Sequence, residues 1–291
     1  MSTETESSVI LSRIVLCYKQ ESMLKAWLDE PSLHVEGTEW LVVNDSPAVA
    51  LSDAFREICT RRNIHIVESA LNLGRCNARN LGARHARGQW LDFIDGDDVP
   101  HPMPLESLEG LEAGLLLFPV VGFPPDQLPV VAQPPSVQLP WTADNILQDS
   151  LYPDYFPIDA RPCGTSWRRD TFFELGGYDA RFDDGWEDTQ IAWHAHQRKV
   201  PIARLNYVKQ SYYQGQYEAK TTRICGVSIY NFFSLVEQYG DPAMKEEYRR
   251  QKREALKSAL WQSLHALRQA DVLSLGFRLK VALKVLFKSW K

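Results

Sequence analysis

The sequence predicts an α/β fold: a mixed, mostly parallel, Rossmann-like sheet flanked by helices, with a C-terminal helical extension. Two observations carry this prediction. Strand-like and helix-like segments alternate through the first hundred residues, an order that implies parallel strand pairing with helices on both faces of an open sheet. After residue 228 the pattern becomes mainly helical.

Four strands and three helices make up the alternating part. A short apolar run with Arg13 as its single charge predicts the first buried strand. Apolar spacing and the glycine that follows a basic segment, Gly88, predict helices and their ends. The expected order is strand 10–17, helix 21–28, strand 39–43, helix 51–62, strand 64–67, helix 74–87 and strand 90–94.

The alternation is interrupted in the middle of the chain. One more strand is expected over 115–122, and the proline-rich loop 119–162 holds ten of the 17 prolines. Loops of this length in a compact fold are usually functional. The order resumes with a strand at 164–168 and helices near 170–175 and 185–198. We therefore expect a disordered N-terminus (1–8), one α/β domain (9–227) and a helical region (228–291).

Composition excludes several classes of protein. Hydrophobic residues make up 44% and charged residues 24%, which excludes wholesale disorder. The net charge of -5 argues against a nucleic-acid partner. The five cysteines are scattered without a Cys-x-x-Cys pair, as in a reducing compartment. The polar N-terminus has no signal-peptide pattern, and no apolar run approaches the ~20 residues of a membrane span. We expect a cytoplasmic protein.

The C-terminal end is basic, whereas the rest of the chain is acidic. Residues 244–291 carry twelve basic and four acidic side chains, a net charge of +8. Lys280, Lys284 and Lys288 share one face of a predicted amphipathic helix. Two interpretations remain open. The helix docks on an anionic membrane, at the inner face of the plasma membrane, or it packs its apolar side on the protein while the lysines stay solvated.

The most specific local pattern is an acidic turn after the strand 90–94. Asp95, Asp97 and Asp98 lie within four residues around Gly96. Their mutual repulsion favours a hard divalent cation with oxygen ligands, Mg²⁺ or Mn²⁺. A solvated acidic turn is the alternative. Because open α/β sheets bind ligands at the carboxyl ends of their strands, the position of the turn favours the cation.

Two further segments could bind a ligand. Asn72 and Gly74 precede a basic helix, whose N-terminus favours anionic groups. Trp186, Glu187 and Asp188 begin a later helix. Carboxylates beside an indole suit a sugar, although acids in a first turn also simply complement the helix dipole.

In this order and spacing, these segments resemble the family 2 glycosyltransferases of the GT-A fold. The matching segments are 14–18, 41–45, 72–82, 90–98 and 164–194. Residues 176–179 followed by 185–188 also look like the acceptor-side motif of galactosyltransferase-type enzymes. The combination is specific, although each segment alone is not.

The resemblance implies an inverting enzyme that moves a sugar from a nucleoside-diphosphate sugar, expected to be UDP-linked, to a hydroxyl of a glycan or lipid-linked acceptor. It implies a Mn²⁺ or Mg²⁺ ion at Asp95 and Asp97. It also implies that Asp188 is the catalytic base and that Glu187 and Trp186 contact the acceptor. The implied nucleotide-sugar contacts are Tyr18, Asp45, Asn72, Arg79 and Asp95.

The chain departs from the family pattern in one respect that bears on the metal. Related enzymes often carry a histidine ligand after the catalytic acid, but residues 211–216 contain none. A non-catalytic glycan- or nucleotide-binding module with the same fold is one alternative function. A nucleotidyltransferase is another, and the segment from Tyr18 to Glu21 disfavours it because it lacks a glycine-rich loop.

Overall fold

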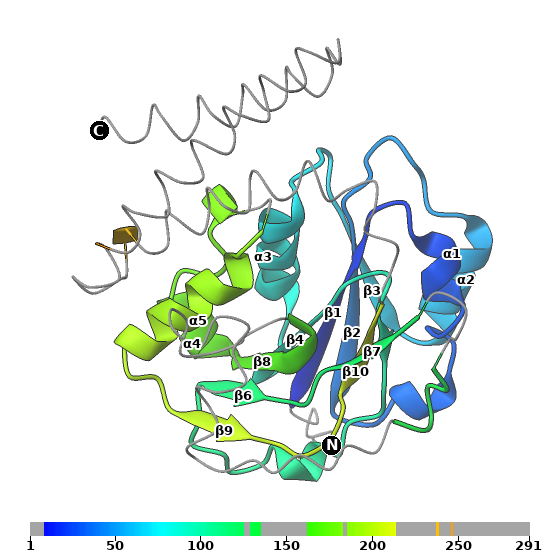
Figure 1. Cartoon of the computed structure of the whole chain (residues 1–291). Helices are drawn as coiled ribbons and strands as arrows, with labels where there is room; N and C mark the ends of the chain where they lie inside the picture. The colour runs from blue at the N-terminus through cyan, green and yellow to red at the C-terminus, as the bar shows by residue number, and fades with distance from the viewer. Residues whose placement is uncertain are drawn as a thin grey trace, which may run out of the picture.

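The computed structural model describes residues 9–124, 129–134, 162–182 and 185–213, together with 237, 238 and 246. Its centre is a seven-stranded sheet with the order β3-β2-β1-β4-β8-β6-β9 (Figure 1). The strands are β1 (Leu11–Cys17), β2 (Thr38–Asn44), β3 (Ile64–Glu68), β4 (Trp90–Ile94), β6 (Leu115–Leu117), β8 (Thr165–Arg168) and β9 (Ile202–Arg204). The strands β3, β2, β1 and β4 are parallel, β8 runs antiparallel to both β4 and β6, and β9 is parallel to β6.

Helices cover both faces of this sheet (Figure 1). They are α1 (Glu21–Lys25), α2 (Asp53–Arg61), α3 (Arg75–His85), α4 (Arg169–Glu174) and α5 (Glu187–Gln197), with short 3-10 turns at Pro31–Leu33, Leu105–Ser107, Pro162–Gly164 and Ala180–Phe182. One core joins α3, α4 and α5 to the sheet, and a second joins α1 and α2 to its other face. Helix α3 packs closely, because a Cβ on Gly82 would lie 2.4 Å from the side chain of Ile14.

A second, three-stranded sheet has the order β5-β10-β7. Its strands are β5 (Val99–Pro100), β7 (Val121–Phe123) and β10 (Gln210–Tyr213). Strand β10 runs antiparallel to β5 and parallel to β7. Because Val99 and Phe123 belong to the same core as α1 and α2, this sheet packs on that face. It begins directly after the acidic turn 95–98.

The α/β fold and the alternating strand–helix order are confirmed. The predicted strands at 10–17, 39–43, 64–67 and 90–94 coincide with β1 to β4 to within one residue at each end. The single strand predicted over 115–122 is instead two strands in different sheets, β6 and β7. Pro119 lies between them, and proline has no N–H for a strand ladder. The short strands β5, β9 and β10 were not predicted.

Several predicted segments lie outside the described residues. They are the N-terminus (1–8), most of the proline-rich loop 119–162, and nearly all of the helical region 228–291 with its basic end. Their interpretations therefore stay predictions. No helix in the described part of the chain is long and apolar enough to cross a membrane.

Candidate active site

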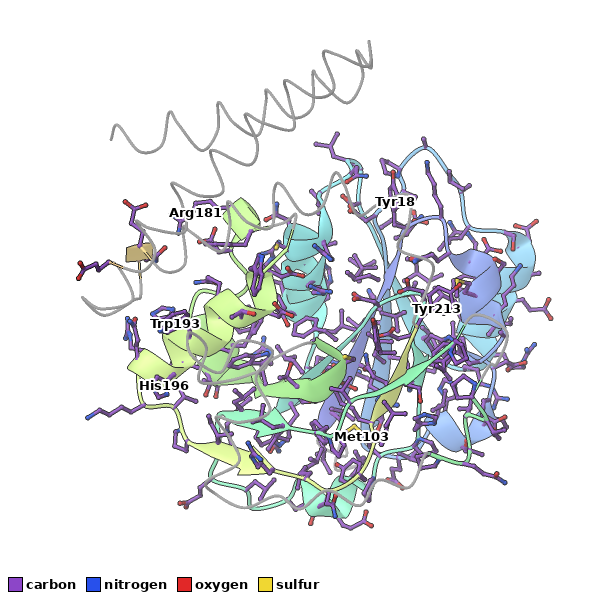
Figure 2. The ribbon with its side chains drawn as sticks, viewed as in Figure 1. Tyr18, Met103, Arg181, Trp193, His196 and Tyr213 are labelled. Atoms are coloured by element: carbon purple, nitrogen blue, oxygen red, sulfur yellow. The ribbon has the colours of Figure 1, made fainter. Side chains whose placement is uncertain are left out.

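The carboxyl ends of three parallel strands place the predicted donor-side residues at one edge of the sheet. Tyr18 follows β1, Asp45 follows β2 and Asp95 follows β4. The amide of Asp45 donates to the carbonyl of Cys17 at 3.1 Å, so the ends of β1 and β2 are joined. Figure 2 shows Tyr18 at this edge and Met103 at the opposite end of the sheet.

Asp45 fixes the turn that leads into α3. Its carboxylate accepts from the amide of Leu73 at 2.6 Å and from that of Gly74 at 3.1 Å. Asn72 Oδ1 also accepts from the Gly74 amide at 3.1 Å. Gly74 has φ 76°, a left-handed conformation that favours glycine. The structure thus brings Asp45 and Asn72 together at the N-terminus of α3.

The acidic turn is closed by a hydrogen bond from the amide of Asp98 to the carbonyl of Asp95 at 2.9 Å. At Gly96, a Cβ would lie 2.5 Å from the carbonyl oxygen of Leu16, so a side chain has no room there. The Asp95 side chain is 35% exposed, whereas Asp98 is only 5% exposed. The turn therefore presents one carboxylate outward and encloses another.

Arg79 joins the acidic turn to the start of α5. One terminal nitrogen, Nη2, donates to Asp95 Oδ1 at 2.6 Å, and the other, Nη1, donates to Glu187 Oε1 at 2.7 Å. Arg75 Nε lies 3.3 Å from the same Glu187 oxygen. The Arg79 side chain is 1% exposed, so this bridge lies in the interior of the site. Acids far apart in the sequence thus meet across one arginine.

Asp188 follows the end of this bridge in the sequence. It follows Glu187 in the first turn of α5, and its Oδ1 accepts from the amide of Thr189 at 2.7 Å. Burial raises the pKa of Tyr178, and the charges of Asp188, Glu187 and Asp95 raise it further. The Tyr178 ring packs 5.3 Å from the Arg79 guanidinium. Asp188 is therefore the chain neighbour of the acid that binds Arg79.

Trp186 begins α5 in an unusual backbone conformation. Its φ of 74° and ψ of 10° are left-handed, a region that costs a residue with a Cβ about 1–2 kcal/mol. Gly185 before it has φ 137°. Such strain persists where the surroundings dictate it, and it concentrates at active sites and ligand clamps. The structure thus presents the predicted acceptor-side tryptophan on a constrained turn.

The electrostatics of the acidic turn suit a cation. Burial raises the pKa of Asp98 well above its usual range, and repulsion by Asp95 and Asp97 adds to this. Burial by itself would also raise the pKa of Asp95. The charges of Arg79 and Arg75 outweigh this effect, and the pKa of Asp95 is lowered. Negative charge on the turn is thus only partly balanced by the arginines.

The residues present fit a metal ion as a partial ligand set. Carboxylate oxygens are the ligands that Mg²⁺ and Mn²⁺ prefer. Among the residues that the structure describes, no group of three or more His, Cys, Asp or Glu side chains could hold a metal. Asp95 and Asp97 would therefore need oxygens from a diphosphate and from water to complete the coordination.

Of the segment where a histidine is expected from the family resemblance, the described residues lie beside the acidic turn. The amide of Tyr213 in β10 donates to Asp98 Oδ1 at 3.0 Å, and Gln210 Nε2 donates to Asp98 Oδ2 at 3.0 Å. Residues 214–216 lie outside the described part of the chain. His194 and His196 lie in the last turn of α5, at the other end from Glu187 and Asp188.

Two residues of the site were given no role by the sequence prediction. Asn80 Nδ2 donates to the carbonyl of Tyr178 at 2.7 Å, and Asn80 Oδ1 accepts from the amide of Tyr178 at 2.9 Å. Gly177 has φ 71°, and a Cβ there would lie 2.7 Å from Asn80 Oδ1. This contact ties the segment before α5 to α3. The sequence signals that could have revealed this contact are Asn80, next to Arg79, and the adjacent glycines 176 and 177.

The mostly parallel α/β sheet flanked by helices is the fold of GT-A structures. Residues 12–111 match the family described as Glycosyl transferase family 2. This match spans 100 of the 291 residues of the chain.

Solved structures show the same fold. The mannosyltransferase PcManGT from Pyrobaculum calidifontis, in complex with GDP-Man and Mn²⁺, matches with a TM-score of 0.55 and 17% identity, over 96% of this chain and 87% of that one. S. aureus TarS matches with a TM-score of 0.51 and 18% identity, over 76% of this chain. The match covers 40% of the TarS chain, so it involves less than half of that protein. No curated protein sequence matches this chain significantly.

Proposed function

We propose that this protein is an inverting, metal-dependent glycosyltransferase that moves a sugar from a nucleoside-diphosphate sugar to a hydroxyl of a glycan or lipid-linked acceptor. The observation that carries the proposal is the arginine bridge. Arg79 binds Asp95 of the acidic turn at 2.6 Å and Glu187, beside Asp188, at 2.7 Å. The acid proposed to bind the metal and the neighbour of the candidate base therefore contact the same arginine.

On the donor side, Asp95 and Asp97 would hold Mn²⁺ or Mg²⁺, and the ion would neutralise the diphosphate as it leaves. The Asn72–Gly74 turn and the N-terminus of α3 favour anionic groups. Tyr18, which is 46% exposed, is available to stack on the base. The family resemblance favours UDP, whereas the solved mannosyltransferase holds GDP-Man. The experiment below therefore also has to identify the nucleotide base of the donor.

On the acceptor side, Asp188 takes the proton of the acceptor hydroxyl while the oxygen attacks the anomeric carbon. The new glycosidic bond forms as the bond from that carbon to the diphosphate breaks, and the configuration is inverted. Trp186 supplies a stacking surface for a sugar ring. Both Nη atoms of Arg79 bind carboxylates, so its contribution is to hold Asp95 and Glu187 in place.

The remaining parts of the proposal depend on residues 228–291, nearly all of which lie outside the described part of the chain. They are the division into a catalytic domain (9–227) and a helical region (228–291), and the docking of the basic end on a membrane surface. A lipid-linked acceptor would suit such docking. A cytoplasmic location at the inner face of the plasma membrane belongs to the same proposal.

The test is a comparison of donor binding with donor turnover. Calorimetry with UDP and GDP, with and without Mn²⁺, should show metal-dependent binding of one nucleotide. Hydrolysis of the matching nucleotide sugars, with water as the acceptor, then measures turnover. Asp188→Asn should lower turnover about 10²–10⁴-fold, the usual contribution of a general base, and leave nucleotide affinity within about threefold.

Asp170→Asn is the matched control. Asp170 is an exposed acid in the first turn of α4, so its loss should leave turnover unchanged. Unchanged turnover in Asp188→Asn would refute the assignment of the base. Metal-dependent nucleotide binding without any turnover in the wild type would favour a non-catalytic binding module.

A further inference from the structure

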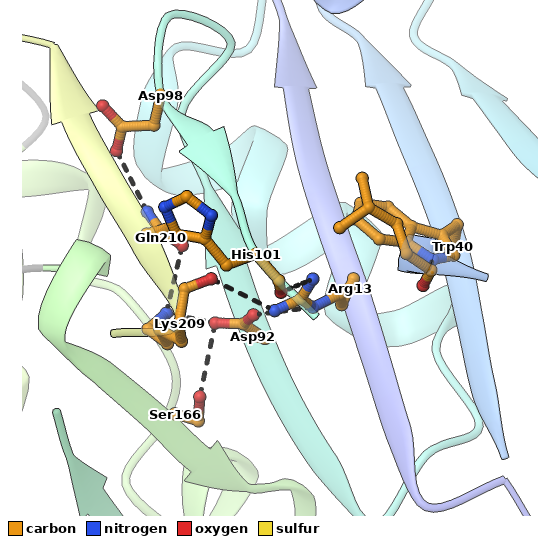
Figure 3. Close-up of polar contacts among 9 residues, drawn as sticks. Arg13, Trp40, Asp92, Asp98, His101, Ser166, Lys209 and Gln210 are labelled. Atoms are coloured by element: carbon orange, nitrogen blue, oxygen red, sulfur yellow. Dashed lines mark hydrogen bonds and ion pairs between the residues drawn. The ribbon is translucent and has the colours of Figure 1, made fainter. Parts of the chain in front are cut away.

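A buried charge network lies beneath the acidic turn, between the large and the small sheet (Figure 3). Asp92 of β4 is its centre. Arg13 Nε of β1 lies 3.2 Å from Asp92 Oδ2, and Lys209 Nζ forms an ion pair with Asp92 Oδ1. All three side chains are at most 1% exposed. Ser166 Oγ also donates to Asp92, at 3.3 Å.

This network fixes the start of β10. Arg13 Nη1 donates to the carbonyl of His101 at 2.8 Å, and Nη2 donates to the carbonyl of Lys209 at 3.3 Å. The amide of His101 in turn donates to the Lys209 carbonyl at 2.8 Å. Buried charges are stable only when their partners are held in a defined geometry. The backbone at residue 209 is therefore anchored to the central strands.

Gln210 extends the network to the acidic turn. Lys209 Nζ donates to Gln210 Oε1 at 3.2 Å, and Gln210 Nε2 donates to Asp98 Oδ2 at 3.0 Å (Figure 3). A lysine ammonium is only a donor, so it dictates which end of the amide faces it. The NH₂ group must then point at Asp98. The other carboxylate oxygen of Asp98, Oδ1, accepts from the amide of Tyr213 at 3.0 Å.

The backbone of Asp98 closes the acidic turn, because its amide donates a hydrogen bond to the Asp95 carbonyl at 2.9 Å. Anything that holds the Asp98 side chain therefore also sets the backbone that carries Asp95 and Asp97. We propose that Gln210 is a positioning residue of the donor site: through Asp98 it fixes the direction in which the acidic turn presents its carboxylates to a cation and a diphosphate. This inference rests on the proposed glycosyltransferase function.

The reciprocal exchange of amide and carboxylate tests the proposal. Asp98→Asn alone places an NH₂ group against either Gln210 Nε2 or the Tyr213 amide, since both are donors. Gln210→Glu alone places a second carboxylate against Asp98. The double substitution restores the pattern, because the new carboxylate at 210 accepts from Lys209 and from the new amide at 98. A double-mutant cycle isolates this pairwise coupling.

Two readouts are needed. The first is hydrogen–deuterium exchange of peptides that span 95–98, which requires no donor. The second is the Mn²⁺ concentration for half-maximal binding of the nucleotide, UDP or GDP. We expect each single substitution to speed exchange and to raise the Mn²⁺ requirement about tenfold or more, since small displacements of a positioned group have large effects. The double substitution should return both to within about threefold of wild type.

Ser211→Ala is the matched control on the same strand. It removes the 2.8 Å contact between Ser211 Oγ and His101 Nε2 and leaves Asp98 untouched. It should lower stability without changing the Mn²⁺ requirement. Unchanged exchange in the single variants, or faster exchange with an unchanged Mn²⁺ requirement, would overturn the proposal. An additive double variant would also overturn it.

Failure of the proposed function gives a different result. A wild type that binds neither nucleotide with Mn²⁺ would refute the glycosyltransferase proposal and, with it, the role of Gln210 at a donor site. Faster exchange in the single variants, restored in the double one, would then still establish the hydrogen-bonded link between Gln210 and the turn.

Discussion

Two charge clusters of this protein have opposite compositions. At the edge of the sheet, one cation, Arg79, lies between two acids, Asp95 and Glu187. In the interior, one acid, Asp92, lies between two cations. The interior side chains are at most 1% exposed, whereas Asp95 is 35% exposed. In the described part of the chain, the interior cluster is therefore enclosed, whereas the edge cluster reaches the surface at Asp95.

The balance of charge separates the two clusters further. The interior holds two cations and one acid, a surplus of one positive charge, which faces Asp98 through Gln210. The edge holds five acids and two arginines, so its acids outnumber its cations by three. These residues are Asp95, Asp97, Asp98, Glu187, Asp188, Arg75 and Arg79. The comparison indicates that the interior charges hold strands together, whereas the edge charges are the ones that we propose to bind a cation.

The largest expected effect is on the interior cluster. Asp92→Asn keeps the shape of the side chain and leaves Arg13 and Lys209 buried without their counter-charge. Breaking a buried ion pair in this way costs about 3–5 kcal/mol of unfolding free energy. Urea denaturation followed by tryptophan fluorescence measures the loss.

The matched acid at the edge should behave differently. Asp97 is part-exposed, and its charge raises the pKa of buried Asp98 by repulsion. Asp97→Asn should therefore change the unfolding free energy by less than about 1 kcal/mol and weaken Mn²⁺-dependent nucleotide binding instead. Equal losses of stability in the two variants would remove the distinction between the clusters.

An intermediate effect is expected at Arg79. Lysine keeps the charge but cannot bind Asp95 and Glu187 with two nitrogens of one planar group. Arg79→Lys should cost about 2 kcal/mol of stability, the scale of a hydrogen bond to a charged partner. It should also lower donor turnover about tenfold or more, since both carboxylates lose their common anchor.

Urea denaturation and donor hydrolysis report these two effects separately. Arg84→Lys is the control, because Arg84 is an exposed residue of the same helix, and it should change neither quantity measurably. A loss of stability in Arg79→Lys with normal turnover would mean that the bridge is structural only.

Sequence patterns predicted the order of the fold well because they report local properties. Apolar runs and helical spacing depend on neighbours within a few residues, so β1 to β4 and α3 were placed correctly. The acids at 95, 97, 187 and 188 were found as motifs for the same reason, although their roles stay predictions. The strand over 115–122 failed because residues 118–120 lead from one sheet into another.

The interior network had no local signal. Arg13 looked like a single charge in a buried strand, and it contacts the carbonyl of Lys209, 196 positions away. The contact depends on strand register and on the small sheet, neither of which periodicity reports. The Arg79 bridge is similar, since it needs the helical phase of α3 and the turn before α5 together. Long-range polar partners are thus the part of this site that sequence reasoning missed.

A third charge cluster, around Glu21 of α1, extends the comparison to the surface. Its loss should have the smallest effect on the free energy of unfolding. Glu21 of α1 binds Lys25 Nζ at 2.6 Å and the amide of Ser52 at 2.8 Å, and Ser52 caps α2. Burial raises the pKa of Glu21, but the hydrogen bonds from Lys25 and Ser52 outweigh it and lower the pKa to about 2. A lowered folded-state pKa gives stability that is complete above the ordinary glutamate pKa and is lost as pH falls toward about 2. Glu21→Gln should therefore cost about 1 kcal/mol near neutral pH, since solvent screens the pair.

The cost of Glu21→Gln should shrink steadily as the pH falls below about 4.5, where the unfolded chain begins to protonate. Urea midpoints across this range measure it. Glu57→Gln is the control, because the Glu57 side chain is 77% exposed and lies 3.8 Å from Arg61. It should show no measurable cost at any pH. A cost in Glu21→Gln that stays constant down to about pH 3 would show that the lost contact acts through packing or shape rather than through the carboxylate charge.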